Sequence, residues 1–148
     1  MPKILIIEDD TAFCQMLQKF LTKNGFVVSI SYSIKEAEEL LAKSTFDIIL
    51  SDVRLPKGNG VTLLPQVKRD SPATQVILMT GYAEVKTAVN AIKKGAFDYI
   101  SKPFTPEEIL SVINNALNVA HTKEETLKKP APSPKKQEQG SFLVGESE

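Results

Sequence analysis

The sequence predicts an α/β fold, a three-layer sandwich in which one parallel sheet lies between two layers of helices. Two observations predict it. Short apolar runs alternate with segments of helical spacing five times along the chain. Several of these runs are almost entirely apolar, which is typical of strands covered by helices on both faces. Five strand–helix repeats are too few to close an eight-stranded barrel, so we expect an open sheet with right-handed crossovers.

The five apolar runs are the predicted strands. Each is only four or five residues long, which suits a strand better than a helix when turn-forming residues lie nearby. They cover residues 4–7, 26–30, 47–50, 75–79 and 97–100.

Apolar residues at helical spacing follow each strand, and several of these segments carry their own start signals. Ser33 with Glu36, and Thr105 with Glu108, have the spacing of a capping box at a helix N-terminus. Pro65 lies about two turns into the third predicted helix and should distort it. The apolar positions of the first, third, fourth and fifth helices are Phe13, Met16, Leu17, Phe20 and Leu21; Val61, Leu64 and Val67; Val85, Ala88, Val89 and Ile92; and Ile109, Val112, Ile113, Ala116 and Leu117.

Charge and cysteine content limit the setting in which the chain works. Eighteen basic residues balance 18 acidic ones, which argues against a dedicated nucleic-acid surface, because such a surface shows a basic excess. The single cysteine, Cys14, cannot form an internal disulfide, as expected in a reducing cytoplasm. The N-terminal apolar run is too short for a signal peptide, and no stretch approaches the roughly 20 apolar residues of a membrane helix. We therefore expect a soluble cytoplasmic protein.

The composition changes near the end of the fifth predicted helix, which indicates a domain boundary. Residues 1–122 contain all the predicted strands and helices. Residues 123–140 are rich in Lys, Glu, Gln and Pro, and we expect a linker there because such a segment cannot bury apolar area. Residues 141–148 turn apolar again, and we interpret them as the start of a truncated downstream domain.

Polar side chains stand at the predicted exits of four strands. Glu8 and Asp9 follow the first strand, Asp52 the third, Thr80 the fourth and Lys102 the fifth. In an open parallel sheet, ligands bind outside the carboxyl ends of the strands. If the strand order is 2-1-3-4-5, these four strands are neighbours, and we expect the five side chains to meet in one small cleft.

Such a cleft has a definite chemical character. Clustered carboxylates repel one another unless a cation lies between them, and oxygen-only ligands suit Mg²⁺. A bound Mg²⁺, a lysine ammonium and a threonine hydroxyl together would bind the three oxygens of a phosphoryl group. A carboxylate among them can act as the nucleophile in phosphoryl transfer, which needs mainly positioning and charge neutralisation.

Four motifs together resemble the receiver domain of bacterial two-component response regulators. The resemblance covers roughly residues 3–120 and implies a flavodoxin-like (βα)5 fold with the strand order 2-1-3-4-5. It also implies that the domain acts as a regulatory phosphoacceptor and not as an enzyme. The motifs are Glu8-Asp9, residues 51–56 around Asp52, residues 79–82 around Thr80, and Lys102-Pro103.

The resemblance also implies roles for the individual residues of the site. Asp52 would accept the phosphoryl group, Thr80 would hydrogen-bond it and Lys102 would neutralise its charge. Glu8 stands where aspartate is more usual in this family, and it would reach the metal largely through water. The implied Mg²⁺ ligands are Glu8, Asp9, Asp52 and the backbone carbonyl of Arg54; no organic cofactor is implied.

Further implications concern switching and partners. Tyr99 occupies the family's switch-aromatic position and would turn inward as Thr80 moves toward the phosphoryl group, and the Lys102-Pro103 peptide bond would be cis. A histidine kinase would donate the phosphoryl group. The surface of the fourth helix, fifth strand and fifth helix would then change and pair two copies, with no membrane or direct nucleic-acid contact through this domain. Residues expected near that surface are Val85, Ala88 and Val89.

A narrower resemblance involves two other segments. Residues 94–104 look like the receivers of NtrC-type transcriptional activators, which work with the sigma factor sigma-54. Residues 142–147 are similar to the opening of the AAA+ ATPase domain of those activators. The implied output is therefore control of transcription by a domain beyond this segment.

Other interpretations remain open at this stage. An aspartyl-phosphate phosphohydrolase would want an Asp-x-Asp motif after the first strand, a spacing that Glu8-Asp9-Asp10 lacks. A flavin-binding electron carrier would want a phosphate-binding loop rich in Ser, Thr and Gly there, where this chain is acidic. Asp10 is better explained as the cap of the first helix than as a metal ligand. Tyr99 could also be an ordinary half-buried strand residue.

Overall fold

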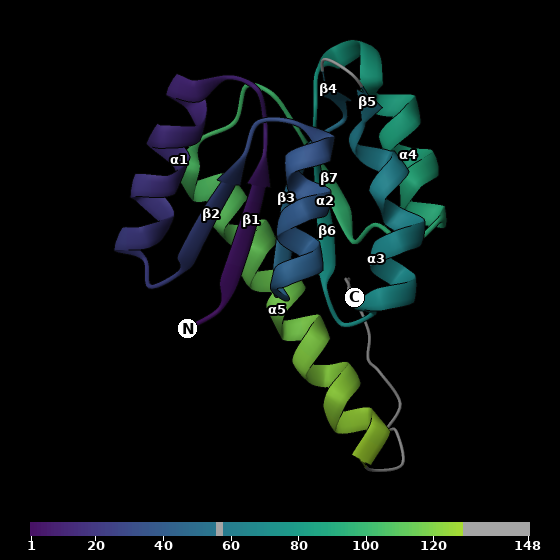
Figure 1. Ribbon diagram of the computed structural model, residues 1–148. Helices are drawn as coiled ribbons and strands as arrows, with labels where there is room; N and C mark the ends of the chain where they lie inside the picture. Colours follow the sequence, from purple (N-terminus) through teal and green to yellow (C-terminus); the bar gives the residue numbers. More distant parts are fainter. Residues whose placement is uncertain (56–57, 129–148) are drawn as a thin grey trace, which may run out of the picture.

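A five-stranded parallel sheet forms the centre of the molecule (Figure 1). The computed structural model describes residues 1–55 and 58–128, with the side chains of Tyr82 and residues 120–128 left aside. The strand order is β2-β1-β3-β6-β7, and every neighbouring pair is parallel. This confirms the predicted order 2-1-3-4-5, since β6 and β7 are the fourth and fifth predicted strands. The strands are β1 (Lys3–Ile7), β2 (Val27–Ser31), β3 (Ile48–Asp52), β6 (Gln75–Thr80) and β7 (Asp98–Ser101).

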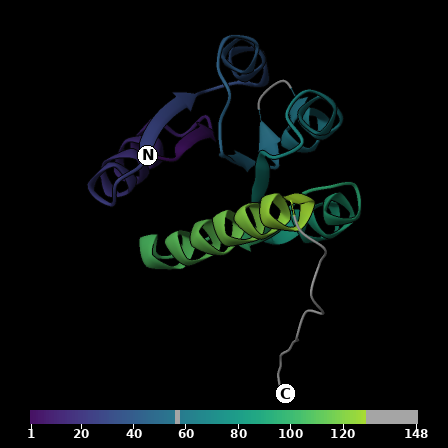
Figure 2. The ribbon, with the colours of Figure 1, turned by 90° about the horizontal axis from the view of Figure 1, so that it is seen from below.

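Helices cover both faces of this sheet and complete the three layers (Figure 2). One apolar cluster joins the sheet to α1 (Thr11–Lys23) and α5 (Pro106–Lys128). A second cluster joins the opposite face to α2 (Ile34–Lys43), α3 (Leu64–Asp70) and α4 (Val85–Lys93). The side chains of β1 alternate between the two clusters, which explains why this strand is apolar at consecutive positions.

Burial at the sheet is nearly complete. Ile4 to Ile7 of β1 and Leu50 of β3 have no exposed area. Burying a side chain of this size contributes about 1.5–3 kcal/mol relative to leaving it in water. The tightly packed strands β1 and β3 therefore hold the residues that follow them in fixed positions at one edge of the sheet.

The capping boxes predicted for α2 and α5 are both formed. The Glu36 amide donates to Ser33 Oγ at 3.2 Å, while the Glu36 carboxylate accepts from the Tyr32 amide at 2.8 Å. The Thr105 and Glu108 pair is reciprocal, with distances of 3.1 and 2.7 Å. Each cap satisfies backbone amides that have no partner within their own helix.

The prediction that Pro65 distorts the third helix is wrong. The segment begins as the 3-10 helix η1 (Gly60–Leu63), and α3 starts only at Leu64. Pro65 therefore lies in the first turn of α3. Backbone amides in the first turn have no partner within the helix, so the amide hydrogen that proline lacks costs no hydrogen bond. Three short elements were not predicted: the antiparallel hairpin of β4 (Arg54–Leu55) and β5 (Gly58–Asn59), and the 3-10 helix η2 (Tyr82–Glu84).

Helix α5 runs beyond the predicted domain boundary at residue 122. It continues to Lys128 and projects past the sheet (Figure 1), so residues 123–128 of the predicted linker are helical. Lys and Glu are good helix formers, and extending an existing helix needs no new nucleus. The rest of the predicted linker, 129–140, and the predicted start of a further domain, 141–148, lie outside the described residues. Among the helices that are described, none is long and apolar enough to cross a membrane.

Gly60 brings η1 close to the end of β3, and we expect its replacement to be destabilising. The Gly60 amide donates to the carbonyl of Val53 at 2.9 Å, and an added Cβ would clash with Ser51 Oγ and the carbonyl oxygen of Asp52. Gly60→Ala should lower the free energy of unfolding in urea by about 1–3 kcal/mol, the usual cost of overpacking. Gly81→Ala is the matched control, because a Cβ there meets no atom of the described residues within 4 Å, its chain neighbours aside. Equal effects of the two substitutions would contradict the prediction.

Candidate functional site

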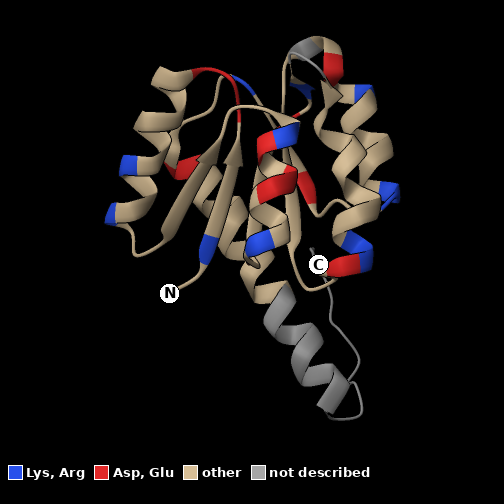
Figure 3. Cartoon of the chain, viewed as in Figure 1, with Lys and Arg blue, Asp and Glu red and all other residues tan. Residues whose placement is uncertain are grey.

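The strands of the sheet deliver their polar residues to one edge. In Figure 3 an acidic loop lies at the top of the molecule, where β1 leads into α1. Glu8 and Asp9 belong to this loop; Asp52 ends β3, Thr80 ends β6, and Lys102 follows β7. Since β1, β3, β6 and β7 are consecutive in the sheet, these exits are neighbours, as the sequence predicts.

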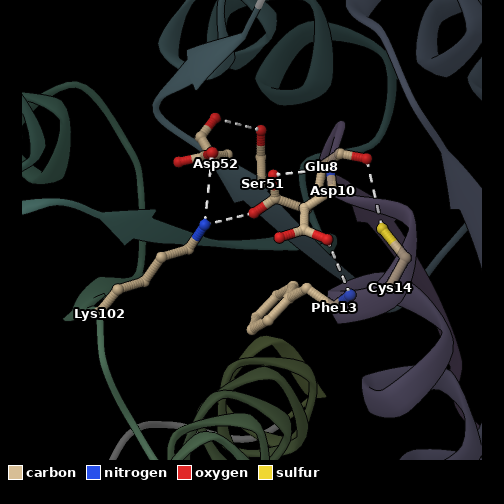
Figure 4. A network of polar contacts seen from close by, with 7 residues as sticks. All are labelled: Glu8, Asp10, Phe13, Cys14, Ser51, Asp52 and Lys102. Carbon is tan, nitrogen blue, oxygen red and sulfur yellow. Dashed lines mark hydrogen bonds and ion pairs between the residues drawn. The ribbon is translucent and has the colours of Figure 1, made fainter.

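Lys102 links the exits of three strands (Figure 4). Its ammonium donates to Glu8 Oε1, and the distance from Nζ to Asp52 Oδ2 is 3.5 Å. The lysine side chain is 31% exposed and that of Asp52 is 15% exposed, while Glu8 is 2% exposed. A charge as buried as Glu8 needs a partner, because an unpaired buried carboxylate would cost several kcal/mol.

Burial and neighbouring charges shift the acid–base properties of this pair. Burial raises the pKa of Glu8 above its usual value; the hydrogen bond from Lys102 opposes this, whereas Asp9 and Asp52 reinforce it. Burial alone would lower the pKa of Lys102, but the hydrogen bond to Glu8 and the charge of Asp52 outweigh burial, so this pKa is raised. Lys102 therefore carries a positive charge over the whole physiological pH range.

Thr80 has an unused hydroxyl beside this network. Its side chain is fully buried, and Oγ1 is the one buried side-chain nitrogen or oxygen, among the residues that the structure describes, without a hydrogen-bond partner. The Thr80 carbonyl accepts the Lys102 amide at 2.7 Å, which ties the end of β6 to the residue after β7. A buried hydroxyl without a partner is uncommon and is suited to receive an oxygen ligand.

Three carboxylates lie close enough to share one cation. Glu8, Asp9 and Asp52 each offer an oxygen, and these oxygens lie within 4.8 Å of one another. An all-oxygen, acidic donor set suits a hard divalent ion such as Mg²⁺. Asp10 is not part of this set: its side chain accepts the Phe13 amide at 3.1 Å, which confirms that it caps α1.

The site opens to solvent as a cleft of about 640 Å³. An exposed ion pair between Arg54 and Glu84 joins β4 to the start of α4 at this cleft; Arg54 is 76% exposed, so the pair contributes little to stability. The residues that line the cleft are Asp9, Asp52, Arg54, Leu55, Gly81, Ala83, Glu84 and Lys102.

The remaining predicted residues have mixed outcomes. Tyr99 is half-buried and packs against the apolar cluster beneath α2, α3 and α4. The Lys102-Pro103 peptide bond is cis, as predicted. Val89 is 41% exposed, as a surface residue should be, but the prediction that Ala88 lies near the surface is wrong, because Ala88 is fully buried.

Sequence reasoning missed two contributors to the site. Ser51 is buried and its hydroxyl donates to the carbonyl of Asp52 at 3.0 Å. Phe13, which helical spacing assigns simply to helix packing, lies with its ring under the Lys102 ammonium, 4.9 Å from Nζ to the ring centroid. No local pattern distinguishes Phe13 from the other apolar residues of α1, so only the folded structure identifies this contact.

Residues 4–114 match the family model described as the response regulator receiver domain. The chain belongs to this family. The transcriptional regulatory protein ZraR of Salmonella typhimurium is 35% identical over 130 residues, 88% of this chain and 29% of that protein. The DNA-binding transcriptional regulator NtrC of Klebsiella pneumoniae is 35% identical over 127 residues, 86% of this chain and 27% of that protein. The resemblance to NtrC-type receivers is therefore confirmed.

A solved receiver domain has the same fold. The response regulator receiver domain from Clostridium thermocellum superposes with a TM-score of 0.77 at 30% identity, over 86% of this chain and 99% of that one. The receiver domain described here spans less than a third of the curated relatives' length, 29% of ZraR and 27% of NtrC.

Cys14 lies directly beneath the site of this receiver domain, and we expect its thiol to be unreactive. It is fully buried, and Sγ donates to the carbonyl of Glu8 at 3.3 Å. Burial raises the pKa of Cys14 to about 12, and the negative charge of Glu8 adds to this. Because the thiolate is the reactive form, a thiol-modifying disulfide reagent at pH 8 should leave the folded protein unmodified and react in concentrated urea.

The control for this prediction is a double variant, Ala12→Cys with Cys14→Ala, which moves the thiol to an exposed position of the same helix. That thiol should react without urea. Rapid modification of Cys14 in the folded wild-type protein would contradict the prediction.

Proposed function

We propose that this receiver domain is a phosphorylation-controlled switch that accepts a phosphoryl group on Asp52 from a histidine kinase. The observation that carries the proposal is the grouping of a carboxylate, an ammonium and an unpartnered hydroxyl at neighbouring strand exits. The Asp52 carboxylate borders the open cleft, so a donor can reach it. The Lys102 ammonium lies 3.5 Å from Asp52 Oδ2, and the Thr80 hydroxyl has no hydrogen-bond partner among the described residues.

The carboxylates fit Mg²⁺ as the cofactor. Glu8, Asp9 and Asp52 supply the acidic oxygens, and the backbone carbonyl of Arg54 would complete the protein's share of the ligands. When bound, Mg²⁺ would neutralise the repulsion between carboxylates and phosphoryl oxygens. Glu8 already accepts hydrogen bonds on both carboxylate oxygens, from Lys102 and from the Asp10 amide at 3.3 Å. Its contribution to the metal would therefore be made largely through water.

The chain's own residues account for the transfer step. An Asp52 oxygen attacks phosphorus and forms a new O–P bond, while the P–N bond to the kinase histidine breaks and the imidazole leaves as the neutral base after gaining a proton from solvent. Asp52 needs no general base, because its carboxylate is already the nucleophile. Lys102 neutralises charge on a phosphoryl oxygen, and Thr80 donates its hydroxyl to another.

Thr80 and Tyr99 would carry the signal away from the site. They lie on the neighbouring strands β6 and β7, where Leu78 pairs with Tyr99. As Thr80 turns toward the phosphoryl group, Tyr99 would move further inward from its half-buried position and change the surface of α4, β7 and α5. Val89 and Ile92 are already exposed on α4, at 41% and 36%. We propose that this surface pairs two copies and controls the output.

The proposed output is regulation of transcription in the cytoplasm, through sigma-54 and a domain beyond this segment. The relatives ZraR and NtrC are named as transcriptional regulators. The domain itself would act as a phosphoacceptor with slow loss of phosphate and without turnover of a substrate. An aspartyl-phosphate phosphohydrolase would instead turn over phosphate esters through Asp9, but Glu8-Asp9-Asp10 lacks the Asp-x-Asp spacing that such an enzyme would want.

Phosphorylation of Asp52 is the direct test of this function. With acetyl phosphate and Mg²⁺, the intact protein should gain the mass of one phosphoryl group, and fragmentation should place it on Asp52. Asp52→Asn should abolish the gain, because an amide cannot act as the nucleophile. Asp47→Asn is the control: Asp47 precedes the opposite end of β3 and binds the Lys3 amide at 2.8 Å. Label on Asp9, or turnover that survives Asp52→Asn, would favour the phosphohydrolase.

Stability should depend on Mg²⁺ through Asp9. If Mg²⁺ binds only to the folded state, it should stabilise the wild-type protein by about 2.7 kcal/mol at a free Mg²⁺ concentration about 100 times the dissociation constant. Asp9→Asn should be more stable than wild type without Mg²⁺, because one repelling charge is gone, and should lose most of the Mg²⁺ response. Urea unfolding at fixed ionic strength, with and without Mg²⁺, measures both effects.

Asp10→Asn is the matched control for Asp9→Asn, since it removes the neighbouring charge while asparagine still caps α1. It should retain the Mg²⁺ response. A response lost equally in both variants would place the metal outside the proposed carboxylate set.

A further inference from the structure

The aromatic ring of Phe13 lies against the ammonium of Lys102. The distance from Nζ to the ring centroid is 4.9 Å, within the range of a cation–π interaction. Phe13 belongs to the first turn of α1, whereas Lys102 follows β7, so folding brings the two together from distant parts of the sequence. Figure 4 shows the ring beside the lysine chain, below the carboxylates of Glu8 and Asp52.

The ring is itself held in place from two sides. The Phe104 ring meets it edge to face, with centroids 5.8 Å apart and an interplanar angle of 81°. The Phe13 amide donates to the Asp10 side chain at 3.1 Å, which fixes the backbone from which the ring extends. Phe13 is half-buried against the apolar cluster under α1 and α5. Its orientation therefore depends on packing and does not require Lys102.

The Phe13 ring restricts the Lys102 side chain on the side that faces away from the carboxylates. A lysine side chain has a long, flexible stem, and holding its ammonium in one place costs rotamer entropy. Glu8 and Asp52 attract the ammonium toward the cleft, but the Lys102 side chain is 31% exposed, so water competes for the ammonium. An aromatic face on the remaining side excludes water and still attracts the positive charge.

We infer that Phe13 is a positioning residue that holds the Lys102 ammonium over the acidic cleft. Its consequence for phosphoryl transfer rests on the proposed function, whereas the contact itself does not. Phe13 is not among the described residues that line the cleft, and it reaches the site through its contact with Lys102. Loss of the ring should slow phosphorylation by about three- to tenfold, the effect of a partly exposed cation–π contact, and should leave Mg²⁺ affinity unchanged.

The contact is tested first, by NMR of the isotopically labelled full chain without any phosphodonor. Wild-type protein should show a nuclear Overhauser contact between the ring protons of Phe13 and the ε-CH₂ of Lys102, and the ε-CH₂ shift should move in Phe13→Leu. Phe13→Tyr retains a ring and should restore both signals. A folded wild-type protein without this contact, or an ε-CH₂ shift unmoved in Phe13→Leu, would overturn the inference regardless of whether Asp52 is phosphorylated.

The positioning role is tested by rates of phosphorylation from acetyl phosphate at saturating Mg²⁺. Phe20→Leu is the matched control, because Phe20 lies on the same helix, is also half-buried and packs against the same cluster. Phe13→Leu should be slowed about three- to tenfold, Phe13→Tyr should be close to wild type, and Phe20→Leu should keep the wild-type rate even though it unfolds at lower urea.

Two outcomes of the rate experiment separate the inference from the proposed function. Equal slowing in Phe13→Leu and Phe20→Leu would mean that loss of packing alone explains the effect, and the positioning role would be rejected. If wild-type protein accepts no phosphoryl group at all, the proposed function fails, and the NMR contact still decides whether Phe13 positions Lys102.

Discussion

The ion pair between Lys102 and buried Glu8 is the interaction on which the rest of the site depends. Glu8 is 2% exposed, and its carboxylate is tolerated there because the ammonium compensates for lost hydration. The same ammonium approaches Asp52, so one positive charge serves the ends of both β1 and β3. The net charge of the cleft remains negative, which favours the proposed binding of a divalent cation and, with that cation bound, of a phosphoryl group.

The parallel sheet makes this arrangement possible. Consecutive strands β1, β3, β6 and β7 end at one edge, where residues separated by up to 94 positions come within hydrogen-bond distance. Close packing on both faces leaves the strand ends little freedom to move. The loops beyond the strand ends are less constrained by packing. There the contact of the Phe13 ring with Lys102 and the cap at Asp10 hold the chain in place.

Many features of the fold and the site are predictable because they depend on which residue types stand at the ends of apolar strands and at the starts of helices. Both capping boxes and the cap at Asp10 follow from such local signals. The meeting of Asp52 with Lys102 follows from them only together with the strand order, which the family resemblance implies and no short segment encodes. The errors have a different origin. Pro65 falls in the first turn of α3 because a 3-10 turn precedes that helix. Ala88 is buried together with Ala91, so the buried face of α4 consists of alanines, while the larger Val89 and Ile92 are exposed. The contact of Phe13 with Lys102 requires the packing of α1 against the loop before α5, which no short segment encodes.

The choice of glutamate at position 8 has a structural consequence. One carboxylate oxygen binds Lys102, and the other accepts the Asp10 amide at 3.3 Å, so the side chain bridges the lysine and the turn that starts α1. Aspartate is one methylene shorter and would sit farther from the lysine with the same backbone. A shorter side chain would leave the ammonium more dependent on Asp52 and on the ring of Phe13. With glutamate at this position, Glu8, Asp52 and the ring of Phe13 all contribute to holding Lys102, and Asp52 remains available for its proposed role as the nucleophile.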